Sequence, residues 1–180
     1  MMPINVSQQL KAPVGSIRNY DVDEIIDIVG STSRIQGKVE LTRTNRSILV
    51  KGRSHTEVDV SCSRCLNLFR YPLVLNIEEE YFPVTDVVNG ISLPLPDELG
   101  CFTIDEHHLL DLTEAVQQYA LLAIPMKPLC GQDCAGLCSN CGRNLNQEPC
   151  HCPPQQSENS WSELNKLAFI SDITKRKETE

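Results

Sequence analysis

The chain has 180 residues, of which 41% are apolar, and its formal net charge is −8 at pH 7. A chain of this length buries one substantial core, so we expect one domain with small additions rather than two full domains. The acidic balance disfavours a protein that coats RNA nonspecifically, because such binding relies on an excess of positive charge. The sequence has no signal-like start and no run of about 18 apolar residues, which predicts a cytoplasmic protein without a membrane span.

Residues 1–126 are predicted to form a β-rich domain. Four segments of this stretch alternate apolar and polar residues, as half-buried strands do. They are residues 35–43, 47–53, 57–62 and 68–82. We expect them to pair as an antiparallel meander punctuated by Gly37, Asn45 and Gly52. The stretch 83–100 is rich in proline and glycine and is predicted to be a loop.

One helix is predicted near residues 111–124. Asp111 and Glu114 have the spacing of a capping box at a helix start, and Pro125 is expected to end the helix. Four apolar residues recur at helical spacing, which predicts one face packed on the sheet. They are Leu112, Val116, Tyr119 and Ala123.

Eight of the nine cysteines fall into four close pairs. The pairs are Cys62 with Cys65, Cys130 with Cys134, Cys138 with Cys141, and Cys150 with Cys152, and Cys101 stands apart. In a reducing compartment this spacing is typical of metal ligands rather than disulfides. The last two pairs lie on one short segment and supply a complete four-sulfur site, here called site 2. By elimination the first two pairs form site 1, whose first pair is predicted to lie at the tip of a hairpin.

A competing arrangement of the cysteines stays open. It places Cys130, Cys134, Cys138 and Cys141 in a single site, and it leaves Cys150 and Cys152 idle or pairs them with Cys62 and Cys65. Tetrahedral all-thiolate sites suit zinc or an iron–sulfur cluster. Close cysteine pairs on short turns, called knuckles, favour zinc, so two zinc ions are expected. Because sulfur fills every ligand position, the predicted role of the metal is structural rather than catalytic.

The rest of the domain organisation follows from these sites. Residues 127–153 are predicted to form a zinc-binding module, and residues 154–180 a polar linker with a short C-terminal helix. The expected fold class is therefore α+β: an antiparallel β-rich domain with one packed helix and a C-terminal zinc-knuckle module.

The predicted strands carry a basic stretch within the acidic chain. Residues 34–70 contain eight basic and three acidic residues. A basic island of this kind can orient a protein on a polyanion, so any RNA contact is expected here. The candidate RNA-binding residues are Arg34, Lys38, Arg43, Arg46, Lys51, Arg53 and Arg64. The alternative is a solvated charged sheet face without a ligand.

Three motifs resemble the YceD family, the large-subunit (23S) ribosomal RNA accumulation proteins. They are "SCSRCL", "LDLTEAVQQYALLAIPMKPLC" and "CAGLCSNCGRNLNQEPCHC", and the resemblance covers about residues 35–152. Within this family, the chain resembles the full-length members, which carry the C-terminal cysteine cluster. The resemblance implies a role in accumulation or maturation of 23S ribosomal RNA. The partner expected from the resemblance is 23S ribosomal RNA or a preribosomal particle. A ribosomal protein or an assembly protein is a further expected partner.

The sequence contains no GxxxxGK phosphate loop and no HExxH zinc motif. The missing motifs lead us to expect a non-enzymatic protein with structural zinc, and the family resemblance implies that it acts as a ribosome-biogenesis factor. Two other classes remain open: a zinc-stabilised protein–protein adaptor, and a thiol redox protein that uses a CxxC pair.

Overall fold

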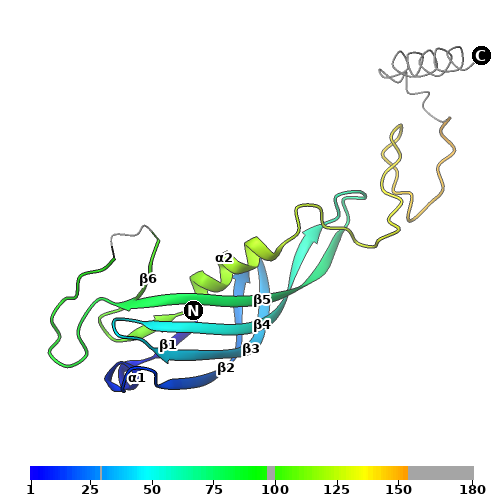
Figure 1. Cartoon of the computed structure of the whole chain (residues 1–180). Helices are drawn as coiled ribbons and strands as arrows, with labels where there is room; N and C mark the ends of the chain where they lie inside the picture. The colour runs from blue at the N-terminus through cyan, green and yellow to red at the C-terminus, as the bar shows by residue number, and fades with distance from the viewer. Residues whose placement is uncertain (29, 97–99, 154–180) are drawn as a thin grey trace, which may run out of the picture. The chain divides into compact units, whose positions relative to one another are not determined.

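The computed structural model describes residues 1–28, 30–96 and 100–153. The chain forms two compact units, Met1–Cys134 (unit 1) and Ala135–Glu180 (unit 2). Unit 1 contains all the named elements (Figure 1). They are β1 (Pro3–Asn5), α1 (Ser7–Lys11), β2 (Ile17–Ile28), β3 (Ser31–Arg43), β4 (Ile48–Ser61), β5 (Leu68–Pro83), β6 (Phe102–Ile104), β7 (Leu109–Asp111) and α2 (Thr113–Ala123). The linker and C-terminal helix expected over 154–180 lie outside the described residues.

The strands form one seven-stranded sheet in the order β1-β7-β6-β5-β4-β3-β2. The strands from β2 to β5 follow one another as antiparallel hairpins, which confirms the expected meander. The sheet as a whole is mixed, because β6 pairs parallel to β5 over Tyr81↔Phe102 to Pro83↔Ile104. The expected antiparallel, β-rich domain is therefore confirmed only in part: it holds for β2 to β5, whereas β6 adds a parallel pair. The long connection after β5 returns the chain to the same end of the sheet, so β6 runs in the direction of β5.

Two glycines lie inside strands rather than between them. The predicted strands 47–53 and 57–62 are one strand, β4, which contains Gly52, and Gly37 lies inside β3. A Cβ on Gly37 would stand 2.4 Å from the carbonyl oxygen of Arg53, and one on Gly52 would stand 2.6 Å from Cγ1 of Val39. Both positions therefore need glycine for a close approach of neighbouring strands, and not for a turn. Asn45 lies in the β3–β4 turn, as expected.

The core lies between the inner face of the curled sheet and α2. The helix packs through Ala115, Val116 and Ala120, which are buried, and the hydroxyl of Tyr119 donates to the carbonyl oxygen of Glu78 at 3.1 Å. Ala123, which was expected on this face, is exposed because the helix ends there. Neither of the two described helices has the length and hydropathy that a membrane-crossing helix requires.

The start of α2 differs in detail from the predicted capping box. The N-cap residue is Leu112, without a side-chain cap, and Asp111 precedes it. One carboxylate oxygen of Asp111 accepts the backbone N–H groups of Thr113 at 2.9 Å and of Met2 at 3.0 Å. Glu114 accepts a hydrogen bond from Gln118 one turn later instead of reaching back to the cap. Asp111 thus joins β1 to the helix start, which a local sequence pattern does not encode.

Candidate metal centres

The first half of site 1 is the turn between β4 and β5, which contains Cys62 and Cys65 as predicted for a hairpin tip. The backbone N–H of Cys62 donates to the carbonyl oxygen of Asn67 at 2.9 Å, and that of Leu66 donates to Cys62 O at 2.9 Å. The N–H of Arg64 points at Cys62 Sγ at 3.5 Å. These bonds hold both sulfurs on one side of the turn, and both side chains are buried.

The second half of site 1 follows α2 and is attached to the first by backbone contacts. The N–H of Ser63 donates to the carbonyl oxygen of Pro128 at 2.8 Å. The guanidinium of Arg64 donates to the carbonyl oxygen of Cys134 at 3.0 Å. The segment after the helix is therefore held against the hairpin tip, and its Cys130 and Cys134 face the other two sulfurs.

Site 2 repeats the turn of site 1 within unit 2. The N–H of Cys138 donates to Arg143 O at 2.8 Å, and the N–H of Gly142 donates to Cys138 O at 2.9 Å. These two bonds match those that surround Cys62 in residue spacing. The sulfur of Cys150 lies 3.4 Å from that of Cys138, and it accepts the N–H of Cys152 at 3.3 Å. Each site is thus built from one such knuckle and a second cysteine pair, Cys130 with Cys134 in site 1 and Cys150 with Cys152 in site 2.

In each of the two sites, the positions of the four sulfur atoms fit one tetrahedral metal ion. All four sulfur atoms of each group lie within 4.8 Å of one another. The Cys62–Cys134 and Cys65–Cys130 sulfur pairs are 3.7 and 3.6 Å apart. Metal–sulfur bonds of about 2.3 Å in a tetrahedron separate the sulfurs by about 3.8 Å, whereas a disulfide needs about 2.05 Å. The chain therefore offers two sites that could hold a metal ion.

The grouping of the sulfurs follows the elimination argument from the sequence. The structure brings together one group from Cys62, Cys65, Cys130 and Cys134, and another from Cys138, Cys141, Cys150 and Cys152. The competing arrangement, with Cys134 and Cys138 in one site, does not correspond to either group. Cys101 belongs to neither. Occupancy by zinc stays a prediction.

Each group contains one acidic thiol and at least one that resists ionisation. Backbone N–H groups of Cys130 and Cys65 lower the pKa of Cys62 to about 6, whereas the neighbouring sulfur of Cys65 raises the pKa of Cys130 to about 12. In site 2, backbone N–H groups of Cys141 and Asn140 lower the pKa of Cys138 to about 6. Four clustered sulfurs cannot all ionise without a cation between them, which is the condition that a divalent metal satisfies.

The comparison with protein families decides the identity of the chain. The family model described as "Large ribosomal RNA subunit accumulation protein YceD" matches residues 50–168. The chain belongs to the YceD family. This match confirms the resemblance carried by the sequence motifs.

The YceD-family chain also resembles mycobacterial proteins. It is 24% identical over 184 residues to an uncharacterized protein of Mycobacterium leprae, covering 95% of this chain and 75% of the relative. It is 29% identical over 134 residues to uncharacterized proteins of Mycobacterium bovis and Mycobacterium tuberculosis, covering 74% of this chain. The matched region spans 62% of each of these two relatives, less than two thirds of their length. No solved structure matches this YceD-family chain.

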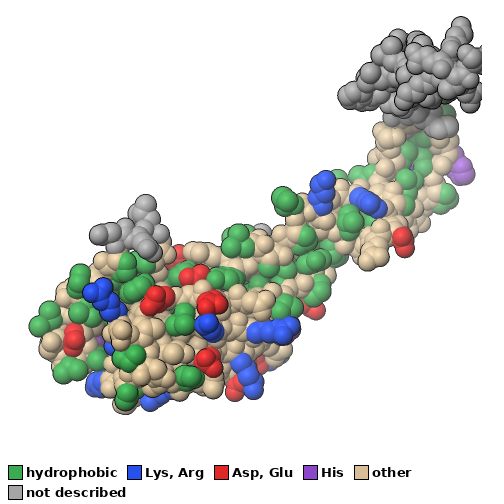
Figure 2. Space-filling model, in the orientation of Figure 1, with side chains coloured by type: hydrophobic (Ala, Val, Ile, Leu, Met, Phe, Trp, Pro, Cys, Tyr) green, Lys and Arg blue, Asp and Glu red, His purple; other side chains and the backbone are tan. Residues whose placement is uncertain are grey.

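The basic residues of the YceD-family chain do not form one continuous positive surface. Arg34, Lys38, Lys51 and Arg53 lie on the exposed face of β3 and β4, Arg43 and Arg46 lie where β3 turns into β4, and Arg64 lies in the site 1 knuckle. Carboxylates of neighbouring strands neutralise several of them. Arg34 pairs with Asp23 at 2.7 Å, Lys51 with Glu78 at 2.7 Å, and Lys38 with Asp21 at 3.8 Å. Figure 2 shows basic and acidic side chains interspersed on the visible face.

Only part of the candidate RNA-binding set is available for a ligand. Among the described residues, Arg46 and Arg53 make no ion pair, and Arg53 stands opposite Lys38 across the β3–β4 ladder. Arg43 donates to the carbonyl oxygen of Ser47, and Arg64 donates to carbonyl oxygens of site 1. Arg64 therefore has a structural role that the sequence did not indicate.

The site 1 knuckle contains a strained residue that can be tested. Leu66 has φ = +59° and occupies the place that Gly142 occupies in site 2 with φ = +69°. A residue with a Cβ in this conformation costs about 1 kcal/mol more than glycine. Since the Leu66 side chain is 65% exposed, its loss removes little packing. We expect Leu66→Gly to raise the free energy of unfolding by about 1 kcal/mol, measured by denaturant unfolding of metal-loaded protein.

Leu68→Gly is the matched control, because Leu68 is 74% exposed but starts strand β5. It should lower stability through the weak strand propensity of glycine. Equal destabilisation by both substitutions would mean that Leu66 makes a contact that outweighs its backbone strain.

Proposed function

We propose that this chain supports the accumulation of 23S ribosomal RNA as a non-enzymatic assembly factor whose two zinc ions are structural. The family match carries this proposal, because the family description names accumulation of the large ribosomal RNA subunit. The donor sets support the role of the metal. Each group supplies four sulfurs, which would fill a tetrahedral zinc and leave no position for water or substrate.

The two zinc ions would stabilise different parts of the chain. Zinc in site 1 would fasten the tip of the β4–β5 hairpin to the segment that follows α2, 65 to 72 residues later. Zinc in site 2 would hold together the described part of unit 2, where backbone order comes from turns and an isolated bridge between Leu137 and Asn144. In both places the free energy of metal binding becomes folding free energy.

The cellular role can be tested by replacement in a host depleted of its own family member. Depletion should lower the ratio of 23S to 16S ribosomal RNA, and this chain should restore it. A variant with Cys62→Ser and Cys65→Ser should fail to restore the ratio, since it cannot complete site 1. Cys101→Ser, outside both sites, is the control and should restore it. A ratio that does not respond to depletion would refute the proposal.

A protein–protein adaptor is the second candidate, and the ion pairs on the sheet favour it. Carboxylates already neutralise Arg34, Lys38 and Lys51, which reduces the charge available for phosphate. Such an adaptor would act in the assembly of the large subunit through a ribosomal or assembly protein. A redox role has less support, because each CxxC pair lies within a group of four sulfurs.

A gel shift with a 23S ribosomal RNA fragment distinguishes direct contact from an adaptor. We expect reversal of Arg43, Arg46, Lys51 and Arg53 to glutamate to weaken binding at least about tenfold and to flatten its salt dependence. The control reverses four basic residues elsewhere, Lys11, Arg18, Lys127 and Arg143, with the same change in net charge. Equal binding by the two variants would place the RNA contact elsewhere and would favour the adaptor.

A further inference from the structure

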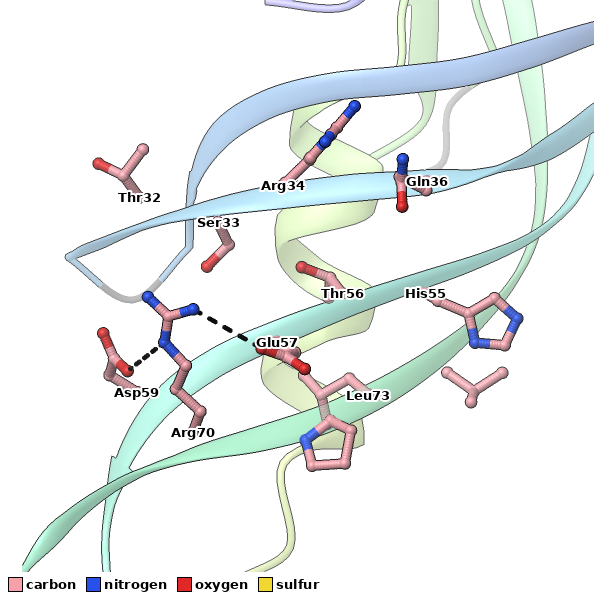
Figure 3. Close-up of a pocket in the computed structure, with 12 residues that line it drawn as sticks. Thr32, Ser33, Arg34, Gln36, His55, Thr56, Glu57, Asp59, Arg70 and Leu73 are labelled. Atoms are coloured by element: carbon pink, nitrogen blue, oxygen red, sulfur yellow. Dashed lines mark ion pairs between the residues drawn. The ribbon is translucent and has the colours of Figure 1, made fainter.

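The sheet of unit 1 opens between β3 and β4. The two strands pair from Arg43↔Ile48 to Gln36↔His55 and no further. Beyond this point β3 stays paired with β2 as far as Ile28↔Ser31, and β4 stays paired with β5 as far as Ser61↔Leu68. Within the described part of the chain, the facing edges of residues 31–35 and 56–61 therefore have no ladder partner. Figure 3 shows the two strands diverging, with α2 behind the gap.

A hollow of about 350 Å³ lies at this opening and is lined by residues of β3, β4 and β5. Thr56, in its wall, is only 5% exposed, and its hydroxyl has no hydrogen-bond partner among the described residues. Figure 3 shows the hydroxyls of Ser33 and Thr56 in the gap between the two strands. Buried polar groups without partners are costly, so the free edges and the Thr56 hydroxyl fit a ligand that supplies hydrogen bonds along a line.

The charges around the hollow disfavour a nucleic acid. Arg70 lies 3.8 Å from both Glu57 and Asp59, so two carboxylates face one guanidinium. Arg34, on the opposite wall, is already paired with Asp23 at 2.7 Å. A phosphate backbone would meet an excess of carboxylates along β4, whereas a basic group would find acceptors there.

We propose that this opening binds an extended peptide segment, which pairs as an added strand with the free edge of β4 over residues 56–61. The pleat of such a strand would place alternate side chains beside Glu57 and Asp59 on the outer face and beside Val58 on the inner, buried face. The partner is therefore a protein segment of about six residues in which basic and apolar residues alternate. This surface goes beyond the proposed role in RNA accumulation.

The free edge of β4 carries the acidic residues Glu57 and Asp59 but lacks two residue types that block an added strand most directly. Proteins protect such edges with proline, lysine or bulges, and residues 56–61 (TEVDVS) contain neither proline nor lysine. An edge without proline or lysine leaves its backbone groups open to an added strand, and its two carboxylates favour a basic one.

The test uses full-length, metal-loaded protein and fluorescent decapeptides that alternate valine or leucine with lysine or arginine. We expect saturable binding by anisotropy and slower amide hydrogen exchange over residues 31–35 and 56–61. A variant with Glu57→Lys and Asp59→Lys should bind at least about tenfold more weakly. The control, Glu106→Lys with Glu148→Lys, has the same charge change at exposed sites outside β2 to β5 and should bind as the wild type does.

A second variant separates binding from folding. Thr56→Val removes the hydroxyl without a partner while keeping a β-branched side chain, so it should raise stability and weaken peptide binding severalfold. Failure of all the peptides to bind, or equal binding by both charge variants, would overturn the proposal. Binding of a single-stranded RNA decamer that is lost when Arg34 and Arg70 become glutamate would assign the opening to RNA. A dimer abolished by the Glu57 and Asp59 reversal would assign it to a second copy of this chain.

Discussion

Replacing Cys62 with serine is expected to lower the zinc content from two ions per chain to one and to destabilise unit 1 by on the order of 5 kcal/mol. The Cys62 side chain is fully buried, and its sulfur lies 3.7 Å from that of Cys134. A serine hydroxyl is a poor ligand for zinc, so the remaining three sulfurs would bind the ion weakly. Metal analysis of protein purified without added metal, followed by denaturant unfolding, measures both effects.

Cys101→Ser is the control for this experiment, because Cys101 lies outside both four-sulfur groups. It should retain two zinc ions and nearly the wild-type stability. A Cys62→Ser protein that still holds two zinc ions would show that site 1 is not a four-sulfur zinc site. Iron in place of zinc would contradict the proposed metal and leave the grouping of the sulfurs intact.

The second large effect is expected in site 2. Changing Cys138, Cys141, Cys150 and Cys152 to serine should remove one zinc ion and unfold the described part of unit 2. The sheet of unit 1 should keep its unfolding midpoint, because site 1 belongs to unit 1 and keeps its ligands. Amide hydrogen exchange measures both outcomes: protection should be lost around residues 135–153 and retained in β3, β4 and β5.

A variant that loses both zinc ions would mean that the two sites depend on each other for metal binding. The backbone N–H groups at positions 138 and 142 are hydrogen-bonded in the knuckle. Slow exchange at these two positions in the four-serine variant would mean that unit 2 folds without metal. The matched control changes Ser139 and Asn140, which lie between the first two ligands, to alanine and should leave the zinc content unchanged.

The grouping of the cysteines into two sets of four could be anticipated from the sequence, because the spacing of each close pair determines how its two sulfurs lie. A CxxC pair brings two sulfurs to one side of a turn, and only four close pairs had to be combined. The β4–β5 hairpin could also be predicted, since Leu73, Leu75 and Ile77 alternate with mostly polar residues and are all buried. In both cases the spacing of residues close together in the sequence was sufficient to predict the structure.

Other features depend on partners that local patterns do not reveal. Strand β2 contains the adjacent acidic residues Asp23 and Glu24, which interrupt its alternation, yet it pairs with β3 over its whole length. The basic stretch looked available for RNA because the carboxylates that neutralise it, such as Asp23 and Glu78, lie outside it in the sequence. The opening between β3 and β4 depends on the residue at which their pairing stops. The sequence pattern of one strand alone does not indicate that residue.

The long sequence separation within site 1 has a consequence for the order of events during synthesis. Cys65 precedes Cys130 by 65 residues. At about 5–20 residues per second, a ribosome needs roughly 3–13 s to make that interval. During this time the nascent hairpin presents a CxxC pair whose two partner thiols do not yet exist. During this interval the two thiols can be oxidised or can bind a soft metal ion other than zinc. We therefore expect the yield of native protein to depend on the redox state of the cell during translation.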